Sequence, residues 1–382
     1  MTLQQFKKIA TLLTCRIFFV ASLVAQNNLP VIKATSRNVK IRDGAVLKDW
    51  WYIVPEARPD VYWVDFPQKE QAVTFITDID SISFVVRHGM AYDFVILVNG
   101  KDSAFTQIAG VYKHQINCTG STGNDSIPFT LRDNRIYFEG AINSSETLSI
   151  QFDLGAGMSN INAKSSYKVK MDFDSSVFLI NSQGRNKARL SSVNTITIGK
   201  LSFLQEAFIE TKNMAKWEDA IVGNSLFLDK YLEIDYNNQL LIIHDSMPPL
   251  DSSWIKLDML LDGGVRPMIS AVLELDGAKY TDWYIFDTGN SGNGIISNEL
   301  TARYGIYDKF NKIIGFAGRK IASIPKITIA GYSFENGTIV LEKPGANLLE
   351  KSVLGNKMLS RLNVVFDNRQ GYLYLKPNKL FK

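Results

Sequence analysis

Hydrophobic and polar residues alternate along much of this 382-residue chain, which is the pattern of β-strands that bury one face. The pattern is clear in residues 72–86 and 92–108, and in the second stretch an Asn99-Gly100 pair separates two apolar runs, as in a β-hairpin. Further strands are expected at 194–203, 326–334 and 371–377. The sequence therefore predicts a mainly β protein.

Helical periodicity is rare and short. Residues 297–306 begin with Ser297, a good N-cap, and continue with a helical pattern. Segments 223–232 and 355–362 each predict one further short helix. We expect such helices to connect strands and not to form a layer of their own.

Two segments of the chain read as copies of each other. An apolar-apolar-Gly-Asn sequence occurs at Gly223 and again at Gly355, 132 residues later. The strand patterns "ITIGKLSF" at 196–203 and "ITIAGYSF" at 327–334 are 131 residues apart. These matches, in the same order and at nearly the same offset, indicate a tandem duplication.

Each copy also contains an apolar strand that runs into an Asp-x-Gly tripeptide. The two are "IQFDLGAG" with Asp153 and "YIFDTGNSG" with Asp287, 134 residues apart. If the copies pack about a pseudo-twofold axis, the carboxyls lie close together, and Gly155 and Gly289 allow the sharp turns that bring them there. Two carboxylates at such a distance share one proton and titrate as a unit. One can then activate water while the other donates a proton.

The length of the chain and two segments rich in turn-forming residues predict the domain organisation. The chain is too long for one core, and a Gly-rich segment at 117–125 and a Pro-containing segment at 244–254 divide it. The predicted parts are a signal peptide at 1–25, an N-terminal β domain at 26–122, and two lobes at 123–247 and 253–382.

The N-terminus has the composition of an export signal. Lys7 and Lys8 precede an apolar run at 9–24, which Arg16 interrupts and Ala25 ends. This segment predicts an exported protein, periplasmic or secreted, whose mature form does not span a membrane. Cleavage of the segment removes Cys15 and leaves a single cysteine, Cys118, so that no intrachain disulfide is expected.

Other chemistries have little support in the sequence. The 3 histidines, His88, His114 and His244, have no metal-ligand or triad spacing, and there is no phosphate-binding loop, dinucleotide fingerprint or nucleophile elbow. The net charge of +4 is spread along the chain, which argues against nucleic acid as a partner. We expect no metal and no cofactor.

The N-terminal region is rich in aromatic residues. They form either the core of a small β domain or an exposed row that stacks on a sugar or a peptide. The residues are Trp50, Trp51, Tyr52, Tyr62, Trp63 and Phe66.

Over about residues 126–380 the two motifs resemble those of pepsin-like and retropepsin-like aspartic peptidases, here of an exported bacterial type. The resemblance implies an all-β fold with two lobes, each a protease-like β-barrel, after a small N-terminal β-sandwich-like domain. It also implies an endopeptidase with Asp153 and Asp287 as catalytic residues and a peptide or protein as substrate. The short halves are similar to retroviral subunits joined in tandem.

The resemblance further implies supporting and covering residues. The supporting residues are Gly155, Thr288, Gly289, Gly223 and Gly355. A flap that closes over the substrate is expected near Gly184 in the first copy and near Gly315 and Gly318 in the second. Ordinary hairpin turns explain these last glycines equally well.

Leu154 departs from the family pattern. The hydroxyl of the central residue braces the opposite half in the family, and Leu154 has none, which removes about 0.5–1.5 kcal/mol of hydrogen bonding. The alternative is therefore a catalytically weak or inactive relative that serves as a peptide- or glycan-binding scaffold. Ala156 and Asn290 follow the motifs where pepsin-like members carry serine, so the pair should titrate higher and act nearer neutral pH.

Overall fold

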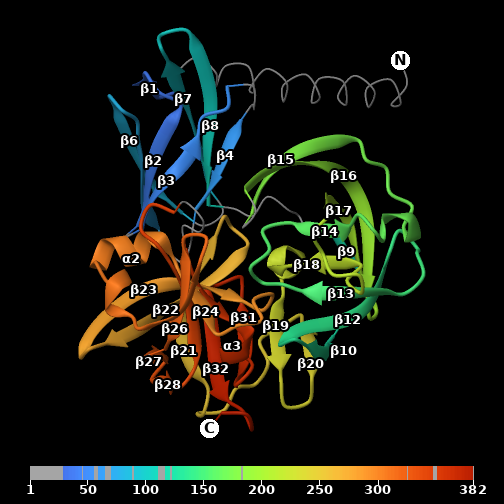
Figure 1. The fold of residues 1–382 in the computed structure, drawn as a ribbon. Coiled ribbons are helices and arrows are strands. Elements are labelled where there is room, and N and C mark those ends of the chain that lie inside the picture. Colours follow the sequence, from blue (N-terminus) through green and yellow to red (C-terminus); the bar gives the residue numbers. More distant parts are fainter. Residues whose placement is uncertain are drawn as a thin grey trace, which may run out of the picture. The chain divides into compact units, whose positions relative to one another are not determined.

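The structure, a computed structural model, consists mostly of β-strands, as predicted (Figure 1). It describes residues 29–44, 46–55, 59–64, 70–87, 90–110, 117–120, 123–181, 184–324, 326–346 and 351–381. The predicted signal peptide at 1–25, with Cys15 and Arg16, lies outside these ranges, as do His88 and His114. Within the described ranges no helix is long and apolar enough to cross a membrane.

The chain forms two compact units, Met1–Val64 with Lys69–Val111 and Asp65–Gln68 with Tyr112–Lys382. The first contains two four-stranded sheets, ordered β1-β7-β8-β4 and β3-β2-β5-β6. Their strands are β1 (Val31–Ala34), β2 (Asn38–Asp43), β3 (Val46–Tyr52), β4 (Asp60–Trp63), β5 (Gln71–Ile76), β6 (Ser81–Val86), β7 (Ala91–Val98) and β8 (Asp102–Ala109). The predicted hairpin joins β7 to β8, and both turn residues, Asn99 and Gly100, have a positive φ of 52° and 68°.

Aromatic side chains fill the core of this first unit. The Trp51 ring meets the rings of Tyr62 and Phe75 edge-on, at centroid distances of 5.5 and 6.1 Å. Tyr62 is 2% exposed, whereas Tyr52 is 57% exposed. The core interpretation is therefore confirmed for Trp51 and Tyr62. Phe66 lies outside the described residues.

The second unit contains two lobes built from corresponding elements (Figure 1). The first lobe has β9 (Asn117–Thr119), β10 (Asp125–Pro128), β11 (Thr130–Arg132), β12 (Arg135–Ile142), β13 (Leu148–Phe152), β14 (Ser159–Asn162), η2 (Ser166–Lys168), β15 (Ser175–Asn181), β16 (Gly184–Ile198), β17 (Leu201–Thr211), β18 (Ala220–Val222), η3 (Asn224–Phe227), β19 (Tyr231–Asp235) and β20 (Leu240–His244).

The second lobe repeats this order. It has β21 (Ile255–Asp262), β22 (Arg266–Leu275), β23 (Ala278–Asp287), β24 (Gly294–Ile296), α2 (Asn298–Tyr304), η4 (Tyr307–Lys309), β25 (Lys312–Phe316), β26 (Arg319–Ser323), β27 (Lys326–Ile329), β28 (Tyr332–Phe334), β29 (Thr338–Glu342), β30 (Ser352–Gly355), α3 (Asn356–Leu359), β31 (Leu362–Asp367) and β32 (Tyr372–Pro377).

A sheet that continues from one lobe into the other shows the duplication directly. Within it, six neighbouring strands follow the order β10-β20-β19-β31-β32-β21, three from each lobe, and the sheet continues from β21 through β22 and β23 of the second lobe. At the centre β19 and β31 pair antiparallel, with Ile234 opposite Val364. Each lobe contributes the same strands in mirrored order, and one buried apolar cluster extends through both lobes. The repeat read from the sequence therefore corresponds to a pseudo-twofold arrangement.

The short helices lie where the sequence predicts them. Segment 223–232 contains η3, and segment 355–362 contains α3. Segment 297–306 contains α2, whose Leu300 N–H donates to the Ser297 hydroxyl at 3.2 Å, and Gly305 ends it with a φ of 60°.

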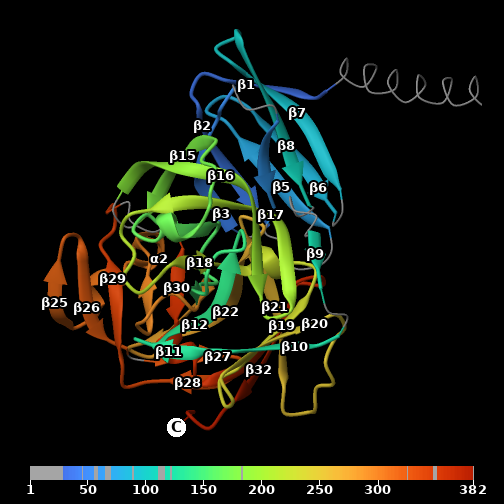
Figure 2. The same cartoon turned by 90° about the vertical axis from the view of Figure 1, so that its right-hand side faces the viewer.

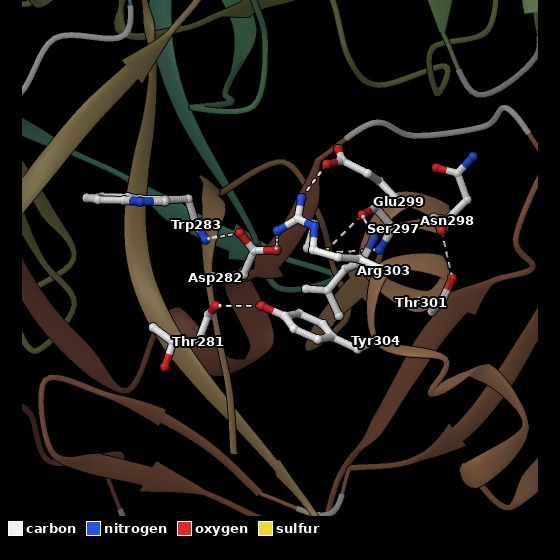
Figure 3. Close-up of polar contacts among 11 residues, drawn as sticks. Thr281, Asp282, Trp283, Ser297, Asn298, Glu299, Thr301, Arg303 and Tyr304 are labelled. Atoms are coloured by element: carbon white, nitrogen blue, oxygen red, sulfur yellow. Dashed lines mark hydrogen bonds and ion pairs between the residues drawn. The ribbon is translucent and has the colours of Figure 1, made fainter. Parts of the chain in front are cut away.

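Helix α2 is attached to β23, the strand that ends at Asp287 (Figure 3). The Arg303 guanidinium donates to the Asp282 carboxylate at 3.0 Å and also pairs with Glu299. The Tyr304 hydroxyl donates to the Thr281 carbonyl at 3.3 Å. These contacts fix the strand along the side that leads toward the second Asp-x-Gly motif.

Candidate active site

Asp153 stands at the end of a buried strand of the first lobe. β13 pairs in parallel with β18, and the Asp153 N–H donates to the Val222 carbonyl at 2.9 Å. The chain then turns, and the Gly155 N–H donates to Asp153 Oδ1 at 2.8 Å. The strand thus delivers the carboxyl to the edge of the core, and the turn orients it.

Asp287 occupies the corresponding place in the second lobe. β23 pairs in parallel with β30, with Asp287 opposite Gly355. The Gly289 and Asn290 N–H groups donate to Asp287 Oδ1 at 2.8 and 3.0 Å. The two carboxyls therefore have corresponding backbone partners, since hydrogen bonds from the Gly155 and Ala156 backbone also lower the pKa of Asp153.

The two motifs face each other across the lobes at very short range. A Cβ atom on Gly155 would stand 2.5 Å from Cγ of Asp287, and one on Gly289 would stand 2.2 Å from Cγ of Asp153. Each carboxyl therefore lies against the glycine of the opposite motif. The prediction that Asp153 and Asp287 meet is supported by this geometry.

The sharp turns predicted at Gly155 and Gly289 are present, because the chain turns at both motifs. They are not the main reason for glycine at these positions. Neither has φ in the left-handed region. Glycine is needed because any side chain there would occupy the space of the opposite carboxyl.

The surroundings of the pair favour a shared proton. Both residues keep partial exposure, although protein atoms densely surround their carboxyls. Burial raises the pKa of Asp153, against the lowering effects of its hydrogen bonds and of the Arg135 charge. Burial and then the negative charge of Asp153 raise the pKa of Asp287 well above its ordinary value. Ionising both at once is costly, so the stable state at mild pH holds one proton between them.

A single threonine braces the two lobes beside the pair. The Thr288 hydroxyl accepts from the Leu154 N–H at 2.9 Å and donates to the Phe152 carbonyl at 2.8 Å. Thr288 is fully buried, as is Leu154, whose apolar side chain packs in the core. The hydrogen bonds therefore join a side chain of the second lobe to the backbone of the first. Leu154 has no hydroxyl for the equivalent hydrogen bonds to the backbone of the second lobe.

Gly223 and Gly355 support the motifs from beneath. A Cβ on Gly223 would stand 2.7 Å from the Ala156 carbonyl oxygen, and one on Gly355 would stand 2.3 Å from that of Gly292. Each glycine thus allows the end of a strand, β18 or β30, to pack directly against the loop that follows the aspartate.

The flap candidates lie on two hairpins at corresponding places in the repeat (Figure 2). Gly184 begins β16 opposite Asn181, and the turn between them, residues 182–183, lies outside the described residues. Gly315 is in β25, and Gly318, with a φ of 76°, forms the turn to β26. The flap role stays a prediction.

Two asparagines that the sequence analysis missed join the lobes. The side chains of Asn224 and Asn368 exchange hydrogen bonds of 2.9 and 3.0 Å, and both residues are fully buried. At the corresponding point Asn356 accepts from the Tyr236 hydroxyl at 2.5 Å. The signal was present, because Asn224 and Asn356 both follow the repeated glycine.

Comparisons with known proteins give a distant likeness. No family model matches the chain, and no curated protein matches it. Among solved structures it is similar to the aspartic proteinase from Irpex lacteus, with 14% identity and a TM-score of 0.48, over 68% of this chain and 98% of that one. A likeness of this strength carries no conclusion about activity.

Proposed function

We propose that this chain is an aspartic endopeptidase in which Asp153 and Asp287 together activate a water molecule. The observation that carries the proposal is the reciprocal packing, in which each carboxyl lies where the opposite glycine would place a Cβ. This arrangement, at the ends of two equivalent buried strands, gives the pair a shared proton and a common face.

The chemistry follows from the shared proton. The ionised carboxyl accepts a proton from water while the water oxygen attacks the peptide carbonyl carbon. At the same time the protonated carboxyl donates its proton to the carbonyl oxygen. The carboxyl that took a proton from water then donates it to the peptide nitrogen, and the other carboxylate takes back a proton from a hydroxyl of the tetrahedral intermediate. The C–N bond breaks, and the pair again holds one proton. No metal or cofactor enters these steps.

The substrate would be a peptide segment bound as an extended strand across both lobes. The hairpins β15–β16 and β25–β26 would cover it. Apolar residues on β25 suit such a role, since Ile313, Ile314 and Phe316 are 53%, 57% and 49% exposed.

The loss of one brace at Leu154 leaves the minimal chemistry in place, because both carboxyls and the Thr288 hydrogen bonds are retained. The one-sided brace is nevertheless the observation that favours the alternative, a weak or inactive relative that binds peptides or glycans as a scaffold.

The test is cleavage of a complex peptide mixture by the chain from residue 26 onward, from acid to neutral pH. We expect the wild type to cleave and Asp287→Asn to lose cleavage. Asp276→Asn is the matched control, since it makes the same chemical change in the exposed turn after β22, where Asp276 has a φ of 52°. A folded wild-type protein without cleavage at any pH would support the scaffold function.

Export is a separate proposal that rests on the sequence of residues 1–25 alone. We propose that the mature protein is periplasmic or secreted. N-terminal sequencing of the chain from its source would test this, with a start near residue 26 expected and an intact Met1 contradicting it.

A further inference from the structure

The turn between β11 and β12 reaches from the first lobe to the second motif. Its two central residues, Asp133 and Asn134, have φ of 50° and 59°, as in a tight two-residue hairpin, with Arg132 opposite Arg135. Arg135 is the first residue of β12 after this turn and is partly buried.

Two side chains of this hairpin hold the backbone that follows Asp287. Arg135 Nε donates to the Gly289 carbonyl at 2.8 Å, and Asn134 Nδ2 donates to the Ser291 carbonyl at 3.0 Å. Hydrogen bonds from a charged donor are among the stronger ones in proteins. The loop that orients the Asp287 carboxyl is thus attached to the first lobe.

The second lobe completes the connection through Asn356. Its side-chain Nδ2 donates to the Asn134 carbonyl at 2.6 Å, and its backbone N–H donates to the Asn290 carbonyl at 2.7 Å. Asn356 therefore connects the turn of the first lobe with the loop after Asp287.

These contacts lie on the side of the site where a brace is missing. Thr288 fixes the backbone on both sides of Asp153, through Phe152 and Leu154. Leu154 cannot do the same for the backbone around Asp287, since it has no hydroxyl. Arg135 supplies a first-lobe donor to that backbone, two residues beyond Asp287.

We propose that Arg135 is a positioning residue that replaces the missing hydroxyl at position 154 by holding the Asp287 loop against the first lobe. This inference rests on the proposed function for its catalytic consequence but not for the brace itself. The Arg135 charge has a further effect, because it lowers the pKa of Asp153 against the raising effect of burial. Among the described residues, the charged groups with the largest effects on the pair are Arg135 from β12 and the two carboxyls themselves.

The first test is a mutant cycle in kcat/KM. We expect Arg135→Ala to lose about tenfold or more in kcat with little change in KM. Arg132→Ala is the matched control, since Arg132 belongs to the same hairpin but stacks on the Trp217 ring at 5.0 Å. In a Leu154→Thr background the loss from Arg135→Ala should shrink to about threefold or less. In a Leu154→Val background, where valine has the shape of threonine without its hydroxyl, the loss should persist. Equal losses in the Thr and Val backgrounds would overturn the proposal.

The pH profile separates positioning from a general loss of stability. Arg135→Gln should move the acid limb of the kcat/KM profile to higher pH, since the positive charge near Asp153 is gone, and Arg135→Lys should move it less. A uniform fall at every pH, with an unmoved limb, would contradict the electrostatic part.

Hydrogen exchange tests the brace even if the chain is no peptidase. The Gly289 and Asn290 amides, which donate to Asp287 Oδ1, should exchange about tenfold faster in Arg135→Ala than in Arg132→Ala. The difference should fall in the Leu154→Thr background. Unchanged exchange in Arg135→Ala would overturn the brace, whereas faster exchange in a protein without cleavage would retain the brace and reject the peptidase function. If Leu154→Thr does not fold, the comparison of Arg135→Ala with Arg132→Ala still decides whether the brace exists.

Discussion

The carboxyl of Asp287 lies so close to Gly155 that a Cβ on that glycine would stand 2.5 Å from the Asp287 Cγ. The reverse relationship, between Asp153 and Gly289, is equally close at 2.2 Å. The two Asp-x-Gly motifs thus depend on each other, because each glycine leaves the space that the aspartate of the other lobe occupies. This explains why both halves of the duplication keep the glycine while the residue between differs.

A methyl group at either glycine should therefore separate the carboxyls. We expect Gly155→Ala and Gly289→Ala to lose more than about a hundredfold in kcat/KM, since displacement by about 1 Å can cost that much. Gly157→Ala is the control from the same loop, because a Cβ at Gly157 meets no atom within 4 Å. Activity of Gly155→Ala equal to that of Gly157→Ala would show that the predicted contact is not made.

The Thr288 brace predicts a loss of stability as well as of activity. Thr288→Val keeps the shape but leaves the buried Leu154 N–H and Phe152 carbonyl without their partner. We expect a loss of about 2–4 kcal/mol in the free energy of unfolding, measured by denaturant titration. Thr288→Ser retains the hydroxyl and should lose much less. Equal stability of the Val and Ser variants would exclude the hydroxyl as the brace.

The raised pKa of Asp287 predicts how stability depends on pH. The group loses its proton near pH 3.8 when unperturbed and at a higher pH in the folded protein. Between these two values the folded state binds more protons than the unfolded state, so the free energy of unfolding falls as pH rises. Asp287→Asn should flatten this fall and make the protein more stable at neutral pH, because the buried carboxyl no longer has to ionise. Parallel pH dependences for the variant and the wild type would contradict the raised pKa.

Activity should extend toward neutral pH for the same reason. The active state holds one proton on the pair, so cleavage begins when the first proton is lost and ends when the second is lost. Burial raises the pKa of both carboxyls, which moves the whole profile upward. Rates measured from pH 2 to 9 should peak in the weakly acid to neutral range, and an optimum confined to strong acid would count against this.

The fold was largely predictable from local pattern and internal repetition. Alternation gave the strands, and Asn99-Gly100 gave a hairpin whose turn residues adopt positive φ, because side-chain period and turn chemistry are local properties. Position 154 also agrees with its side chain. Leu154 has no hydroxyl and packs in the core, and the Thr288 hydroxyl bonds to the first motif without an equivalent bond from position 154.

The contacts between lobes were harder to foresee. Arg135 and Asn134 read as ordinary residues beside a turn, and only the packing of the lobes brings them to Gly289 and Ser291. Asn224 follows the repeated glycine and could have been found, but nothing local marks Asn368, 144 residues away, as its partner. The steric constraint on Gly155 was not foreseen for the same reason, since it comes from the opposite lobe and not from the φ of Gly155.

The most direct measurement is kcat/KM for Asp153→Asn, Asp287→Asn and the double variant on one peptide that the wild type cleaves. If the two carboxyls act as one unit, each single variant should lose nearly all activity, and the double variant should be no worse than either. Substantial activity in Asp153→Asn, with loss only in Asp287→Asn, would contradict the pairing of these aspartates.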